Sequence, residues 1–161
     1  MGARSYFGNG ARVWVHDSRR HEGEFVAADR GKTIVGQVVI GDNVRIGANI
    51  EIDCYEKVEI GDNCLLAPNI CIMDSNHGTS IDTRSYVETA RVIKPVSIGK
   101  GSWIGQRVCI LAGSRIGEKC IIGTNAVVTG NIPDYSIAVG VPARVIKTYN
   151  METRQWEKVV E

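Results

Sequence analysis

Residues 98–133 read IGKGSW, IGQRVC, ILAGSR, IGEKCI, IGTNAV and VTGNIP, a pattern that repeats every six residues. An aliphatic residue opens each group of six, glycine is the commonest second residue, and a side chain of small or moderate size stands fifth. An amphipathic helix would repeat its apolar residues about every 3.6 positions, and a half-buried strand about every 2. The period of six instead predicts a parallel β-helix, in which three hexads make one triangular coil.

Each hexad is expected to supply one short strand and one corner. The fifth and sixth residues and the next first residue should form the strand, with side chains directed in, out and in. Residues two to four should turn the corner, where Gly, Asn and Asp tolerate a positive φ. Stacked coils would lie about 4.8 Å apart and bury their aliphatic residues on one another.

The same period organises most of the chain. It begins at Ile34, is interrupted near Tyr55–Lys57 by two inserted residues, stops after Ile72 and returns at Val92. We therefore expect an irregular N-terminal segment at 1–33, a β-helix at 34–146 with an extruded loop at 73–91, and a C-terminal tail at 147–161. Segment 1–33 contains a candidate first coil from Phe7 and a candidate strand around Phe25. The tail either packs its apolar side on the last coil or frays.

Length and composition set broad limits on function. A chain of 161 residues with 43% hydrophobic residues is expected to form one folded domain. The sequence shows neither a signal peptide nor an apolar run of the roughly 20 residues that cross a bilayer, so we expect a cytoplasmic protein without membrane contact. A net charge of +1 gives no general attraction to nucleic acid.

Five cysteines are expected to pack rather than to react. Cys64 and Cys120 fall at inward fifth positions, Cys71 and Cys109 at outward sixth positions, and Cys54 stands beside the insertion. No Cys-x-x-Cys pair occurs, and a free cysteine behaves as a small hydrophobic residue. We therefore expect no metal site.

The hexads, the interruption Asp74-Ser-Asn-His and the ending Val139-Gly-Val-Pro-Ala-Arg resemble the hexapeptide-repeat acyltransferases. Within them, the sequence is most similar to sugar O-acetyltransferases of the maltose and galactoside type, including those of surface-polysaccharide synthesis. The resemblance implies a left-handed β-helix, a homotrimer with acetyl-CoA between adjacent subunits, and direct acetyl transfer to a hydroxyl of a sugar or glycan precursor. It also implies that His77 is the general base.

Elementary chemistry agrees with that role for His77. A sugar hydroxyl is nearly un-ionised at neutral pH, so its attack on a thioester benefits from a base such as a neutral imidazole. Asp74, Asn76 or Asp82 could fix the tautomer of this ring. The alternative to a catalytic role is that His77 is a solvated loop histidine. The amides of Gly105 or Gly113 could stabilise the oxyanion.

The cofactor residues are inferred partly from the resemblance and partly from outward positions. The family pattern places CoA contacts at Gln106, Thr124, Thr129 and Arg144, with Gly105 opening the corner. In the family pattern a Lys that contacts a phosphate is common where this chain has Gly130, so one expected phosphate contact is absent. Either Lys147 compensates or the affinity for CoA is lower. Residues eighteen apart should stack, which leaves one face of the prism polar and two faces apolar. Trp103 lies on an apolar face, where it either lines the cofactor groove or packs in the trimer.

Three other functions use the same fold. An N-acetyltransferase of an amino-sugar nucleotide would need the same base and donor. A γ-type carbonic anhydrase would need three histidines that converge on one zinc ion. The chain has three in all, His16, His21 and His77, and the first two lie in the irregular N-terminal segment. A trimeric scaffold would bind no CoA.

Overall fold

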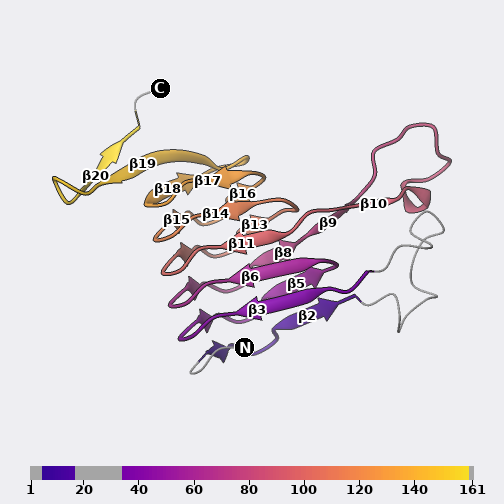
Figure 1. Cartoon of the computed structure of the whole chain (residues 1–161), viewed down its shortest axis with the longest axis horizontal. Helices are drawn as coiled ribbons and strands as arrows, with labels where there is room; N and C mark the ends of the chain where they lie inside the picture. Colours follow the sequence, from indigo (N-terminus) through magenta and orange to yellow (C-terminus); the bar gives the residue numbers. More distant parts are fainter. Residues whose placement is uncertain (1–4, 17–33, 160–161) are drawn as a thin grey trace.

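Three parallel sheets form the sides of a triangular prism. The structure, a computed structural model, describes residues 5–16 and 34–159. Its architecture is a left-handed parallel β-helix, as the hexads and the family resemblance predicted (Figure 1). Among the described residues, no helix has the length and apolar character needed to span a membrane. The strand expected around Phe25 lies outside the described residues.

Successive strands visit the three sheets in turn. The strands of sheet A are β1 (Tyr6–Phe7), β4 (Arg45–Ile46), β7 (Leu65–Leu66), β12 (Trp103–Ile104), β15 (Ile121–Ile122) and β18 (Ser136–Val139). The strands of sheet B are β2 (Arg12–Val15), β5 (Glu51–Cys54), β8 (Cys71–Met73), β13 (Cys109–Ile110) and β16 (Val127–Val128). The strands of sheet C are β3 (Gln37–Ile40), β6 (Lys57–Ile60), β11 (Val96–Ile98), β14 (Arg115–Ile116) and β17 (Asn131–Ile132).

The register confirms the eighteen-residue columns in the C-terminal coils. Trp103 pairs with Ile121 in sheet A, and Cys109 pairs with Val127 in sheet B. The first residue of each hexad points inward, so that the isoleucines of successive coils form one continuous buried core. This burial of aliphatic area is the main source of stability, since each coil covers the apolar side chains of the next.

The corners explain two different uses of glycine. At the second position, as in Gly61 and Gly99, a Cβ would lie within 3.0 Å of backbone atoms of the next coil, so the stacking excludes any side chain. At the fourth position the backbone has positive φ, and Gly101, Asn43 and Asn63 occupy it. The Asn43 side-chain amide donates to the Asn63 side-chain oxygen at 2.9 Å, which ties neighbouring corners together.

The departures from the period in the central coils gather on the edge between sheets B and C. The inserted residues 55–56 join β5 to β6 there, and an arm joins β8 to β11. The arm begins with β9 (Ser75–His77) and ends with β10 (Arg91–Ile93), which pair antiparallel. Because β10 belongs to this ribbon, the coil resumes at Val96 rather than at the predicted Val92. The arm projects away from the prism (Figure 1).

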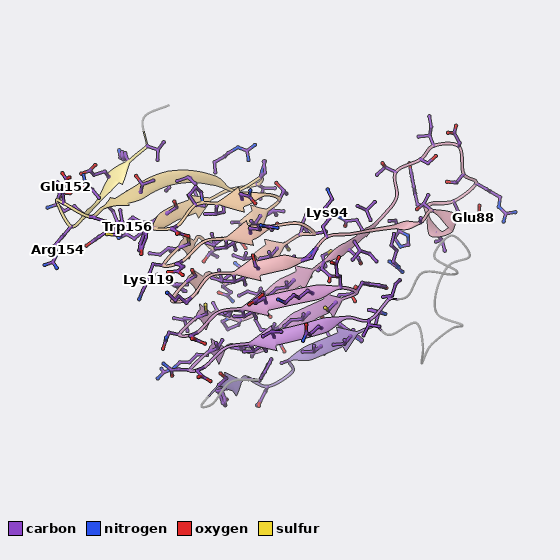
Figure 2. All side chains as sticks on the ribbon, in the orientation of Figure 1. Glu88, Lys94, Lys119, Glu152, Arg154 and Trp156 are labelled. Atoms are coloured by element: carbon purple, nitrogen blue, oxygen red, sulfur yellow. The ribbon has the colours of Figure 1, made fainter. Side chains whose placement is uncertain are left out.

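The tail is an ordered hairpin. Strand β19 (Arg144–Asn150) pairs antiparallel with β18, and β20 (Gln155–Lys158) pairs with β19, so sheet A continues beyond the last coil. Ala143 and Val145 pack on the core, and Tyr149 meets Trp156 edge to face at 5.2 Å. Figure 2 shows the arm, with Glu88, and the hairpin, with Trp156, at opposite sides of the prism.

Candidate active site

The base of the arm presents His77 to solvent. His77 ends β9 and is paired with Arg91 of β10, and the Gly78 amide donates to the Ala90 carbonyl at 3.1 Å just beyond. The Thr89 hydroxyl is hydrogen-bonded to the carbonyls of Gly78 and Tyr86, which closes the loop above the ribbon. The ribbon therefore fixes the backbone of His77 while its side chain stays exposed.

The hydrogen bonds of the Asp74 carboxylate go to groups other than the His77 ring. This carboxylate is fully buried and accepts the backbone amides of Tyr55, Glu56 and Lys57 at 2.8, 2.7 and 2.9 Å. The Asp74 carbonyl also accepts the Lys94 amide at 2.8 Å. The structure thus assigns Asp74 to the joint between the arm and the inserted residues, and does not bring it together with His77.

The other two candidates for orienting His77 are also directed elsewhere. Asn76 precedes His77 in β9, and side chains alternate along a strand, so the two point to opposite faces of the ribbon. The Asp82 carboxylate is hydrogen-bonded to the Ser80 hydroxyl within the loop. Within residues 5–16 and 34–159, no hydrogen bond joins the His77 ring to Asp74, Asn76 or Asp82.

The two backbone amides that were predicted to stabilise the oxyanion already donate to backbone carbonyls. The Gly105 amide donates to the Ile122 carbonyl at 2.8 Å, and the Gly113 amide donates to the Lys94 carbonyl at 3.0 Å. The prediction for these two amides is therefore wrong, because the stacking that requires small corner residues also pairs their backbone. The next amide, that of Gln106, donates to no acceptor in the described part of the chain.

Several of the expected cofactor residues follow one edge. Gly105 and Gln106 form the corner between β12 and β13, and Thr124 lies one coil above, where the Asn125 amide donates to the Gln106 carbonyl at 2.9 Å. Arg144 opens β19 at the top of the same A/B edge and is exposed. These four residues form a line that an extended molecule could follow.

The remaining residues that were expected to bind the cofactor lie elsewhere. Trp103 and Lys147 are on sheet A, where Trp103 stacks between Leu65 and Ile121 and is 49% exposed. Thr129 lies on the B/C edge between β16 and β17, above the arm. The structure therefore divides the predicted residues, with His77 and Thr129 on one edge and the Gln106 line on another.

The cysteine environments favour packing. Burial, and to a smaller extent the Asp74 carboxylate, raises the pKa of the Cys54 thiol to about 12. Burial also raises the pKa of Cys71 to about 11 and the pKa values of Cys64 and Cys120. A thiol with such a pKa is protonated at neutral pH and is a poor nucleophile.

Sequence reasoning missed a cluster around His16. Its Nε2 lies 2.7 Å from a carboxylate oxygen of Asp53, and its ring stacks on Tyr55 with centroids 3.8 Å apart. Asp53 precedes the insertion and Tyr55 is its first residue. The sequence indicated the insertion, but it did not indicate that β2 returns to this edge. His21 lies outside the described residues, and among the described ones no three His, Cys, Asp or Glu side chains gather as a metal site.

Comparison with known proteins places this geometry in a family. The family model for the bacterial transferase hexapeptide (six repeats) matches residues 95–130, and that for the hexapeptide repeat of succinyl-transferase matches residues 37–74. A putative acetyltransferase of Staphylococcus aureus strain COL is 35% identical, and the alignment covers 75% of this chain and 71% of the relative. The chain belongs to the hexapeptide-repeat acetyltransferases.

Other members of the hexapeptide-repeat acetyltransferases are similar as well. A putative lipopolysaccharide biosynthesis O-acetyl transferase of Escherichia coli K12 is 36% identical over 76% of this chain and 66% of its own length. The maltose O-acetyltransferase structure from Clostridium difficile 630 has a TM-score of 0.72 and 32% identity, covering 92% of this chain and 68% of its own.

A galactoside acetyltransferase solved in complex with coenzyme A has a TM-score of 0.61 and 28% identity, and the match covers 96% of this chain and 72% of its own. The chain spans 66% of the full length of the Escherichia coli relative and 40% of the full length of another curated relative.

Proposed function

We propose that this protein transfers an acetyl group from acetyl-CoA directly to a hydroxyl of a sugar or glycan precursor, with His77 as general base. One observation carries the proposal: His77 projects from the arm on one edge of a hexapeptide-repeat prism, and four of the expected cofactor residues line another edge. The naming of a relative as a galactoside acetyltransferase, solved with coenzyme A, supports the donor and the class of acceptor.

The residues on the two edges can form one site only between two protomers. Within one chain, sheet B separates the B/C edge, which carries His77 and Thr129, from the A/B edge, which carries Gln106, Thr124 and Arg144. A homotrimer that sets the B/C edge of one protomer against the A/B edge of the next joins the two halves in three equivalent sites. The apolar outer column of sheet A, which includes Leu65, Trp103 and Ile121, supports association of this kind.

The proposed step needs few groups. The acceptor hydroxyl oxygen attacks the thioester carbonyl carbon while the His77 imidazole takes its proton. The oxyanion that forms is stabilised by the Gln106 amide, which is free among the described residues. The C–S bond then breaks, and the coenzyme thiolate takes the proton from His77. The Arg144 guanidinium suits a phosphate of the cofactor because its donors form a planar fork.

An acceptor screen with acetyl-CoA, followed by thiol release, tests the activity. The screen should include amino sugars, because an amine acceptor would use the same base. We expect release with hydroxyl acceptors, and His77→Ala should lower kcat by about 10² or more without dissociating the trimer. Near-normal turnover of that variant would remove His77 from the mechanism.

Subunit mixing tests the shared site. His77→Ala damages the B/C edge, and Arg144→Ala, assayed at limiting acetyl-CoA, damages the A/B edge. In randomly mixed trimers about one quarter of the sites should combine two intact edges, so two poorly active variants should regain activity on co-expression. Mixtures that show only the average of the two variants would contradict a site between subunits.

A further inference from the structure

A hollow on the outer face of sheet B lies beside the arm and has no role in the steps above. It has a volume of about 390 Å³ and is lined by Trp14, His16, Glu51, Asp53, Tyr55, Cys71, Ile72 and Met73. Six of the eight lining residues belong to three neighbouring strands that pair in register, β2, β5 and β8, and the other two, His16 and Tyr55, directly follow β2 and β5. The hollow is therefore a built feature of the sheet rather than a gap between loops.

The polar side chains of the hollow are held in place. The Arg12 guanidinium pairs with the Glu51 carboxylate and lies over the Trp14 ring, 5.6 Å from its centre. Asp53 is fixed by the His16 ring, whose side chain is only 22% exposed and which is itself stacked on buried Tyr55. Trp14 remains 46% exposed, so part of a large aromatic surface stands next to two ordered carboxylates.

A chain of contacts joins the hollow to His77. The Arg91 guanidinium lies over the Tyr55 ring at 4.5 Å from its centre, and Arg91 is the register partner of His77. Directly paired residues of an antiparallel ribbon project their side chains to the same face, with Cβ atoms about 5 Å apart. The His77 side chain thus leaves the ribbon on the face that approaches Tyr55 and the hollow.

We propose that this hollow is the acceptor subsite and that it binds a pyranose ring of the acceptor. The inference rests on the proposed function, which it deepens. The apolar C–H face of a sugar packs on an aromatic surface, here Trp14, while its hydroxyls donate to carboxylate oxygens, here Asp53 and Glu51. His16 acts as a positioning residue, because it holds the Asp53 carboxylate and does not itself reach the reacting atoms.

A second hollow lacks this chemistry. The groove of about 440 Å³ under the tail hairpin is lined by Trp103, Tyr135, Tyr149 and Trp156, and Lys119 is its one charged lining residue. A sugar ring carries several hydroxyls, and each that is buried without a partner costs binding free energy. The hollow beside the arm offers the carboxylate oxygens of Asp53 and Glu51 for them, whereas the lining of this groove contains no carboxylate.

Steady-state kinetics with varied acceptor test the subsite. Trp14→Ala and Asp53→Asn should each raise the acceptor KM about tenfold or more, with the KM for acetyl-CoA changed less than about twofold. His16→Phe keeps a ring on Tyr55 but loses the bond to Asp53, so it should raise the acceptor KM by a smaller factor and leave kcat near wild type. Glu59→Gln removes an outward carboxylate from sheet C and is the matched control, with no change expected.

Saturation-transfer NMR separates this inference from the proposed function. The probes are methyl hexopyranosides and maltose, added to the full chain without acetyl-CoA. Transfer to ring protons that persists in Glu59→Gln and disappears in Trp14→Ala supports the subsite even if no acetyl transfer is found. Equal transfer in Trp14→Ala, no transfer to any saccharide in the wild-type protein, or an unchanged acceptor KM in both hollow variants would overturn it.

Discussion

Replacing Asp74 by Asn tests the assignment of this residue to the joint beneath the arm. The carboxylate is fully buried, and one oxygen accepts the Tyr55 amide while the other accepts those of Glu56 and Lys57. An Asn side chain keeps one acceptor oxygen and turns an NH₂ group toward the remaining donors. If the oxygen faces the Glu56 and Lys57 amides, one bond is lost and the other two pass from a charged to a neutral acceptor. Hydrogen bonds to charged groups contribute about 1.5–3 kcal/mol each and neutral ones about 0.5–1.5 kcal/mol, so the total cost should be about 3–6 kcal/mol.

The cost should appear as a lower melting temperature. For a chain of this size, each kcal/mol corresponds to about 2–4 °C, so Asp74→Asn should melt at least about 6 °C below the wild type. The assay is thermal unfolding followed by circular dichroism at equal protomer concentration, since assembly shifts the apparent stability. Asp82→Asn is the matched control, because its carboxylate contacts only Ser80 in the exposed loop and should change the melting temperature by less than about 2 °C.

Two results would contradict the assignment of Asp74 to the joint. A melting temperature for Asp74→Asn close to that of Asp82→Asn would mean that the three amides do not depend on the carboxylate. Full stability combined with a loss of turnover as large as that of His77→Ala would return Asp74 to the catalytic machinery and would contradict its separation from the ring.

Four further predictions follow from the corners, the thiols and the edges. Gly99→Ala places a methyl group 2.4 Å from the Gly117 carbonyl carbon and should cost about 2–3 kcal/mol in urea unfolding. Gly130→Lys meets nothing within 4 Å, so it should leave the melting temperature unchanged and, if it restores the phosphate contact, lower the KM for acetyl-CoA about two- to fivefold. Arg144→Ala should raise that KM, with a smaller penalty for dephospho-CoA; equal penalties would exclude contact with the 3′-phosphate. Because the pKa of Cys54 is raised from 9.0 to about 12, the contribution of the thiol to stability is present below pH 9 and is lost as the pH rises toward 12. Between pH 9 and 12 the urea midpoint of the wild type should therefore fall more steeply than that of Cys54→Ala.

The hexads were enough to predict the β-helix, because its stability comes from a pattern that every coil repeats. The inward residues, the outward columns and the insertion at Tyr55–Lys57 all follow from counting residues from one aliphatic position to the next. The interruption with His77 was equally visible, since a solenoid must extrude any segment that breaks its period. The exact limits of this interruption could not be predicted, because β10 has an apolar pattern like that of a coil strand but pairs with β9.

The partners of the site residues depended on the tertiary structure. Asp74 lies three residues from His77 in sequence, yet its carboxylate is committed to amides 17–19 residues away. His16 and Asp53 are 37 residues apart and meet because β2 and β5 stack on the same sheet. The order of residues along the chain was sufficient to establish the repeating architecture and the residue types available for chemistry. Only the stacking of distant coils decided which of these groups are hydrogen-bonded, which remain free, and which edge of the prism each one occupies.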